Sequence, residues 1–134
     1  MKPIHFTEHE MAEVRPARAL TPRERAVLQV LVGASALAEA ARCQVDHAMV
    51  DGECIERCGT VELAVVATKC PTLRMTDGLV ADGEAPLDND HRQAVLLFAQ
   101  SGLIRHVETY RTDGKRPSGL PEAAQLTVLK TPTE

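Results

Sequence analysis

The sequence predicts an α+β protein, in which two N-terminal helices pack on one face of a meandering antiparallel β-sheet. Apolar residues recur at helical spacing over residues 21–42, and alternating patterns bounded by turn residues follow from residue 45 onward. The expected strands also lack between them the long crossovers that a parallel sheet requires. With 134 residues, of which 44% are hydrophobic, the chain is expected to form one domain over residues 20–130, between a flexible arm (1–19) and a tail (131–134).

The first helix has a well-defined start. Thr21 can act as the N-cap, Pro22 suits the first helical position, and Glu24 completes a capping box. An apolar stripe then follows at helical spacing, formed by Val27, Leu28, Leu31 and Val32. Gly33 is expected to end this helix, and Ser35 to cap a second, alanine-rich helix that runs to about residue 42.

The rest of the chain predicts strands. The clearest signal is a hairpin, in which Arg92–Ala99 and Leu103–Arg111 flank a short turn containing Gly102. The other expected strands are Val45–Val50, Thr60–Thr68, Leu73–Thr76, Leu79–Ala81 and an edge strand at Leu126–Leu129. A single helical turn is expected at Pro121–Gln125.

Charge is distributed unevenly along the chain. The net charge is −4, but residues 43–90 hold ten acidic and three basic side chains and so carry −7, which leaves +3 for the remainder. An acidic middle would repel nucleic acid phosphates and anionic membrane surfaces, so neither partner is expected. The first residues lack the apolar segment of a signal peptide, which favours a cytoplasmic location with reduced cysteines.

The cysteines are the most chemically distinctive residues. Cys54 and Cys58 lie in a loop with a spacing that metal sites use, but the sequence offers no second pair of this kind. One alternative is therefore a zinc-stabilised module, in which Cys54 and Cys58 combine with two of Cys43, His47 and Cys70. The other is that Cys43 and Cys70 are small core residues and that Cys54 and Cys58 are partly exposed thiols, with no cofactor.

The segment around the first helix resembles the opening of LuxR-type DNA-binding domains. The resemblance covers about nine residues from Leu20 to Leu28. It implies a helix-turn-helix regulator built on residues 21–50, with Val45–Val50 in the recognition position. That stretch contains no Arg or Lys to contact a phosphate or a guanine, which disfavours DNA binding.

Signals for catalysis are weak. None of the three serines lies in a Gly-x-Ser-x-Gly motif, and no glycine-rich phosphate loop is present in the sequence. His106 and Glu108 share one strand face, and His91 begins the preceding strand, so these residues could form an acid–base group. A solvent-facing polar stripe is the simpler explanation for them, and the sequence favours a protein that is not an enzyme.

A looser resemblance covers most of residues 20–126. The run Gly59–Val65, the hairpin ending in Glu108–Tyr110, Asp113-Gly114 and Leu120-Pro121 is similar to a group of small bacterial proteins, chiefly actinobacterial, that have no assigned function. This resemblance implies the order of elements and a bacterial, cytoplasmic setting. The sequence thus leads us to expect a protein that acts by homodimerisation or by binding another protein, with Leu126–Leu129 as a pairing edge.

Overall fold

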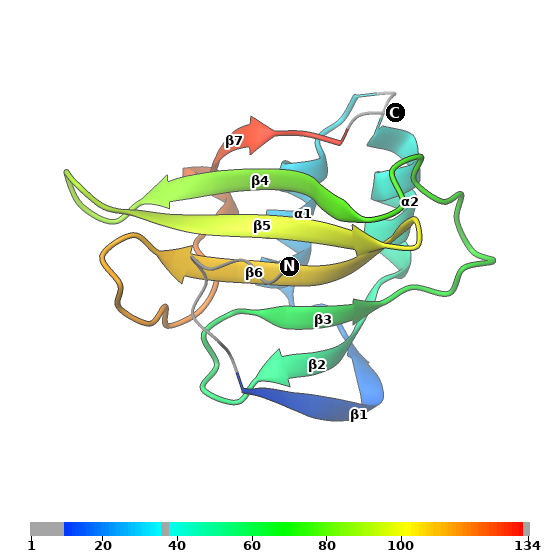
Figure 1. The fold of residues 1–134 in the computed structure, drawn as a ribbon, viewed down its shortest axis with the longest axis horizontal. Helices are drawn as coiled ribbons and strands as arrows, with labels where there is room; N and C mark the ends of the chain where they lie inside the picture. Colours follow the sequence, from blue (N-terminus) through cyan, green and yellow to red (C-terminus); the bar gives the residue numbers. More distant parts are fainter. Residues whose placement is uncertain (1–9, 36–37, 133–134) are drawn as a thin grey trace.

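A computed structural model describes residues 10–35 and 38–132, which form two α-helices and a seven-stranded antiparallel sheet (Figure 1). The α+β class and the antiparallel sheet are therefore confirmed. The helices are α1 (Pro22–Val32) and α2 (Glu39–His47), with a short 3-10 helix, η2, at Ala123–Gln125. The strands are β1 (Met11–Ala19), β2 (Met49–Cys54), β3 (Val61–Ala64), β4 (Gly78–Pro86), β5 (Arg92–Gln100), β6 (Leu103–Arg111) and β7 (Thr127–Lys130).

The strand order is β1-β2-β3-β6-β5-β4-β7, so the sheet is not a simple meander. Strand β3 pairs with β6 rather than with β4, and the chain crosses from β3 to the far side of the β5–β6 hairpin before β4 begins. This order lets Val61 of β3 pair with Val107 of β6, which continues a row of buried side chains across the sheet. Such pairings between distant segments are not visible in a local pattern.

Helix α1 begins as the sequence predicts. The Thr21 side chain accepts a hydrogen bond from the Glu24 backbone N–H, and the Glu24 carboxylate accepts one from the Thr21 N–H. Arg18 also donates two hydrogen bonds to this carboxylate, at 2.9 and 3.0 Å. Gly33 follows the helix with a φ of +73°, as expected for a residue that ends a helix.

Helix α2 differs from the prediction at both ends. It begins at Glu39 after the N-cap Ala38, whereas Ser35 was expected to be the cap. It continues to His47, so the first three residues of the expected strand Val45–Val50 are helical and β2 begins only at Met49. The cause is tertiary packing. Gln44 and Val45 lie on the buried face of α2, and their burial outweighs the strand preference of the valine.

Strand β1 was not predicted, because residues 1–19 were expected to form a flexible arm. Residues 11–19 instead pair with β2, with a register shift between Glu13 and Arg18. An edge strand can remain partly solvated, so it tolerates charged residues and proline. In β1, two Arg side chains and Pro16 therefore interrupt the alternation of apolar and polar residues by which a strand is recognised. Residues 1–9 of the expected arm lie outside the described residues.

The remaining strands mostly agree with the prediction. The β5–β6 hairpin has nearly the predicted bounds, and β7 is an edge strand shifted by one residue. Strand β3 is shorter than the predicted Thr60–Thr68, and no strand forms at Leu73–Thr76. Strand β4 is a single nine-residue strand, because Asp82-Gly83 continues the pairing with β5 where a turn was expected.

In the view of Figure 1 both helices lie behind the sheet. Helix α1 contacts β4 and β7, and α2 contacts β6. The buried cluster between these elements is made of Leu, Val, Ile and Ala side chains, including Leu28, Leu31, Leu63 and Leu97. The alternate residues of β3 and β6, such as Glu62 and His106, project to the other side of the sheet. Among the described residues, no helix is sufficiently long and hydrophobic to cross a lipid bilayer.

Candidate functional site

Cys43, His47 and Cys70 form a cluster at one end of the sheet. Cys43 and His47 are four residues apart on α2 and so share a face of that helix, and Cys70 comes from the connection between β3 and β4. His47 Nδ1 lies 3.5 Å from Cys70 Sγ and 3.8 Å from Cys43 Sγ. Cys70 is only 8% exposed, whereas His47 is exposed. The cluster is therefore open to solvent on its histidine side.

Cys43 and Cys70 are joined by a disulfide that spans 27 residues of sequence. This finding corrects the expectation that all four cysteines are reduced. It also corrects the alternative in which Cys43 and Cys70 act only as small core residues, because the bond links α2 to the β3–β4 connection. The sequence could not reveal the pair, since it depends on how α2 packs beside that connection.

Gln44 links α2 to the β3–β4 connection a second time, through hydrogen bonds that do not involve the disulfide. Its side chain is fully buried, and its Nε2 donates hydrogen bonds to the Pro71 carbonyl at 2.9 Å and the Gly102 carbonyl at 3.0 Å. Its Oε1 accepts a hydrogen bond of 2.8 Å from the Ile104 N–H. Because Pro71 follows Cys70 directly, Gln44 fixes the backbone beside that sulfur to α2.

Cys54 and Cys58 lie elsewhere. Cys54 ends β2 and Cys58 lies in the β2–β3 loop, whereas Cys70 follows β3 at the opposite end of this antiparallel pair (Figure 1). Both are buried, so the expectation of partly exposed loop thiols is wrong. Burial, together with a hydrogen bond to Cys54, raises the pKa of the Cys58 thiol. The zinc set of the alternative hypothesis, which combines this pair with two of Cys43, His47 and Cys70, does not come together.

A second polar cluster lies on β3 and β6. His106 is flanked by two carboxylates: its Nδ1 lies 3.1 Å from Glu62 Oε1, and its Nε2 lies 3.1 Å from Glu108 Oε1. Burial lowers the pKa of His106, but the hydrogen bonds to Glu108 and Glu62 outweigh that effect and raise the pKa to about 9. The hydrogen bond from His106 in turn lowers the pKa of Glu62.

This geometry makes His106 an imidazolium at neutral pH, with both N–H groups directed at carboxylates. It therefore has no lone pair with which to act as a general base. Sequence reasoning paired His106 with Glu108 but missed Glu62, which only the β3–β6 register brings into contact. His91 does not join the group, because it lies seven residues from Phe98, the β5 partner of His106, which is about 23 Å along the strand.

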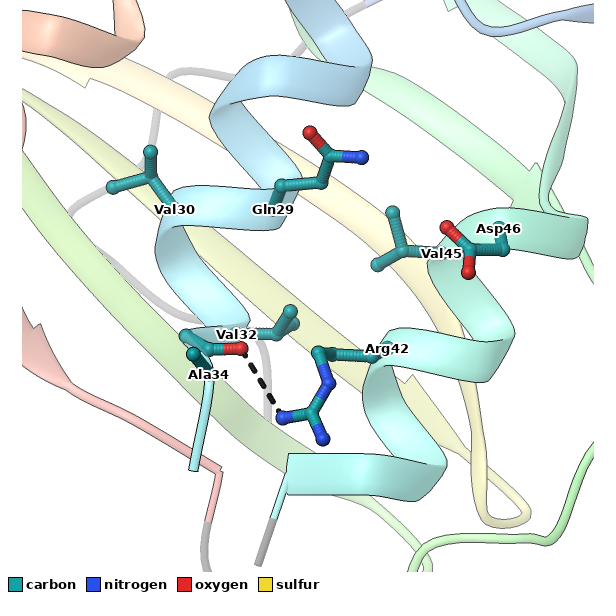
Figure 2. Close-up of a pocket in the computed structure, with 8 residues that line it drawn as sticks. Gln29, Val30, Val32, Ala34, Arg42, Val45 and Asp46 are labelled. Atoms are coloured by element: carbon teal, nitrogen blue, oxygen red, sulfur yellow. Dashed lines mark hydrogen bonds between the residues drawn. The ribbon is translucent and has the colours of Figure 1, made fainter. Parts of the chain in front are cut away.

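A groove between α1 and α2 encloses a volume of about 500 Å³ (Figure 2). Its lining is Gln29, Val30, Val32, Gly33, Ala34, Arg42, Val45 and Asp46. Arg42 reaches across it to the end of α1, where its guanidinium donates hydrogen bonds to the Gly33 and Ser35 carbonyls. Asp46 lies 3.9 Å from the Arg25 guanidinium. The charged groups of the groove are thus used to hold the two helices together.

The helix pair does not continue into a DNA-recognition helix. Residues 45–47 end α2 and residues 49–50 begin β2, so the segment in the recognition position is not helical as a whole. This observation removes the structural basis of the helix-turn-helix alternative for residues 21–50.

Comparisons with known proteins returned no match for this chain among protein families, curated proteins or solved structures. Inferences about its function therefore depend on the geometry described above.

Proposed function

We propose that this protein acts as a non-enzymatic interaction module, and that it forms a homodimer by pairing the edges of two β7 strands. The observation that carries the proposal is the position of β7: it ends the sheet, and among the described residues it pairs with β4 alone. A strand with one unpaired edge presents N–H and C=O groups that a second strand can satisfy.

The two edges of the sheet differ in how well they are protected. Strand β1 at the other edge carries a register shift, Pro16 in its interior, and the charged side chains Arg15 and Arg18. These are features by which proteins prevent edge-to-edge pairing. Strand β7 contains no proline, and its Leu129 is 60% exposed. Lys130 at its end is the single charged side chain of the strand, so β7 is the edge that favours pairing.

The pairing is compatible with a two-fold axis. Residues opposite one another in an antiparallel pair share a face of the sheet, so an axis through Leu129 would place its side chain against the same leucine of the second copy. Val128 would then lie opposite Lys130. Since β7 has only four residues, or about 14 Å of edge, we expect a weak, concentration-dependent dimer.

The test is the oligomeric state of the full chain and of Leu129→Lys. We expect light scattering after size exclusion to give a mass that rises toward twice 14.5 kDa with concentration in the wild type and stays at 14.5 kDa in the variant, because two ammonium groups would face each other at the axis. Val66→Lys is the matched control: Val66 is 59% exposed on the β3–β4 connection, and its replacement should leave the dimer intact.

Two results would contradict the proposal. One is a wild-type protein that remains a monomer at the highest concentration reached, and the other is a dimer that survives Leu129→Lys. Because Leu129 is mostly exposed, the variant is expected to fold, and a circular dichroism spectrum equal to that of the wild type would confirm this. We place this dimer in the cytoplasm, the location that the sequence favours.

A further inference from the structure

We propose that the reduced protein binds one Zn²⁺ ion through Cys43, His47 and Cys70, and that the disulfide is the oxidised, metal-free state of the same site. This inference goes beyond dimerisation and does not depend on it. The ligand atoms of these three side chains all lie within 4.8 Å of one another.

The distances suit a tetrahedral ion. With Zn–S bonds of about 2.3 Å and a Zn–N bond of about 2.0 Å, tetrahedral angles separate the sulfur and nitrogen ligands by about 3.5 Å. His47 Nδ1 lies 3.5 Å from the Cys70 sulfur and 3.8 Å from the Cys43 sulfur, so this nitrogen already lies at the separation that ligands of one zinc ion have. The two thiolates need to be about 3.8 Å apart on the same ion, which reduced sulfurs can reach by side-chain rotation.

The site is expected to persist when the disulfide is reduced. Cys43 and His47 belong to the same helix, and the Gln44 side chain ties that helix to Pro71, the residue after Cys70. Two further hydrogen bonds, to Gly102 and from Ile104, anchor Gln44 itself to the β5–β6 hairpin. Reduction therefore removes one link between segments that buried hydrogen bonds continue to hold together.

The ligand set determines the metal and leaves one position open. Two thiolates and an imidazole favour Zn²⁺ over Mg²⁺ or Ca²⁺, which prefer oxygen ligands. Three protein ligands leave the fourth tetrahedral position for a water molecule, and the exposed side of His47 gives solvent access to it. His47 Nδ1 also lies 3.0 Å from the Cys43 carbonyl, which can accept a hydrogen bond from it when no metal is bound.

The conversion balances with a dithiol reductant. The reductant supplies two electrons and two protons, becomes a disulfide, and leaves Cys43 and Cys70 as thiols. Zn²⁺ then displaces both thiol protons, and the imidazole binds with its proton on Nε2, so that Nδ1 can donate its lone pair. Oxidation by a small-molecule disulfide reverses the sequence and releases the ion. The metal content of the site thus depends on the redox state of its surroundings.

The experiment is zinc chloride titration of the full chain after reduction and removal of the reductant, read by native mass spectrometry. We expect one Zn²⁺ per chain in the reduced protein and none in the oxidised protein. Cobalt chloride in a parallel titration should give the near-ultraviolet charge-transfer band of thiolate ligation. His47→Gln should weaken zinc binding at least about tenfold, and Cys70→Ser should abolish the cobalt band.

Matched controls separate this site from the other cysteines and histidines. Cys58→Ser and His91→Gln should bind zinc as the wild type does, because Cys58 and His91 lie outside the cluster. The proposal is overturned if the reduced wild type binds no zinc, or if Cys58→Ser abolishes binding that His47→Gln leaves intact. His47 is exposed, so its variant is expected to fold even if Cys70→Ser does not.

Discussion

Replacing His106 with Gln should remove a pH dependence of stability that the wild-type protein shows above neutral pH. His106 is held between Glu62 and Glu108 with 26% of its side chain exposed, and the two carboxylates raise its pKa to about 9. In the unfolded chain, where these contacts are lost, its pKa is about 6.5. The folded state therefore binds the proton more tightly than the unfolded state does.

The sign and size of the effect follow from that difference. A pKa that is higher in the folded state contributes stability that is fully present below about pH 6.5 and is lost as the pH rises through about 9. A difference of about 2.5 pH units corresponds to about 3 kcal/mol in the free energy of unfolding. The glutamine variant lacks the positive charge, so it should be less stable by about this amount at pH 6 and nearly equal to the wild type at pH 10.

The measurement is urea unfolding of both proteins at intervals from pH 6 to pH 10. The difference between their free energies of unfolding isolates His106, because the other titrating groups are common to both. His91→Gln serves as the control, since it removes a histidine that pairs with the exposed Asp88 and leaves the Glu62, His106 and Glu108 group untouched. A difference between wild type and His106→Gln that stays constant across this range would refute the reasoning.

Two further predictions concern buried backbone contacts. Gln44→Leu leaves the Pro71 carbonyl and the Ile104 N–H without their partner, so it should lower the free energy of unfolding by about 2–4 kcal/mol. Gln29→Leu, on the exposed side of α1, is the control and should change the free energy of unfolding little. Gly59→Ala should cost more than about 2 kcal/mol, because Gly59 has a φ of +106° and a Cβ would lie 2.8 Å from the Leu120 nitrogen. Gly114 also has a positive φ, of +79°, but a Cβ added there would meet no atom within 4 Å, so Gly114→Ala should cost only about 1 kcal/mol. Urea unfolding measures both, and equal effects within either pair would contradict these explanations.

The parts of the fold that could be predicted are those determined by neighbouring residues. The capping box of Thr21 and Glu24 depends on a three-residue spacing, and the β5–β6 hairpin depends on a glycine with positive φ at its turn. The sequence also showed β7 as a short edge strand. These features need no information about which segments lie side by side, so periodicity and turn chemistry suffice.

The parts that could not be predicted depend on packing between distant segments. Strand β1 carries too many charged residues to show an alternating pattern, and it is a strand because β2 offers it a partner. Glu62 joins His106 only through the pairing of β3 with β6, and those strands are separated by about forty residues of sequence. The acid–base group that the sequence suggests therefore lacks Glu62. Without this second carboxylate, the sequence alone could not show that His106 is held as a cation.

The Cys43, His47 and Cys70 cluster shows how one local error concealed a site. Because the sequence predicts that the second helix ends at about residue 42 and that Val45–Val50 is a strand, it does not place Cys43 and His47 on one helix, although their spacing of four residues suits one helical face. Once α2 is known to continue to His47, the two side chains must lie together, and only Cys70 remains to be brought in from a distance. Gln44 does this through Pro71, and it lies on the same helix between the two ligands. The buried amide that extends α2 beyond its predicted end is therefore also the residue that assembles the candidate metal site.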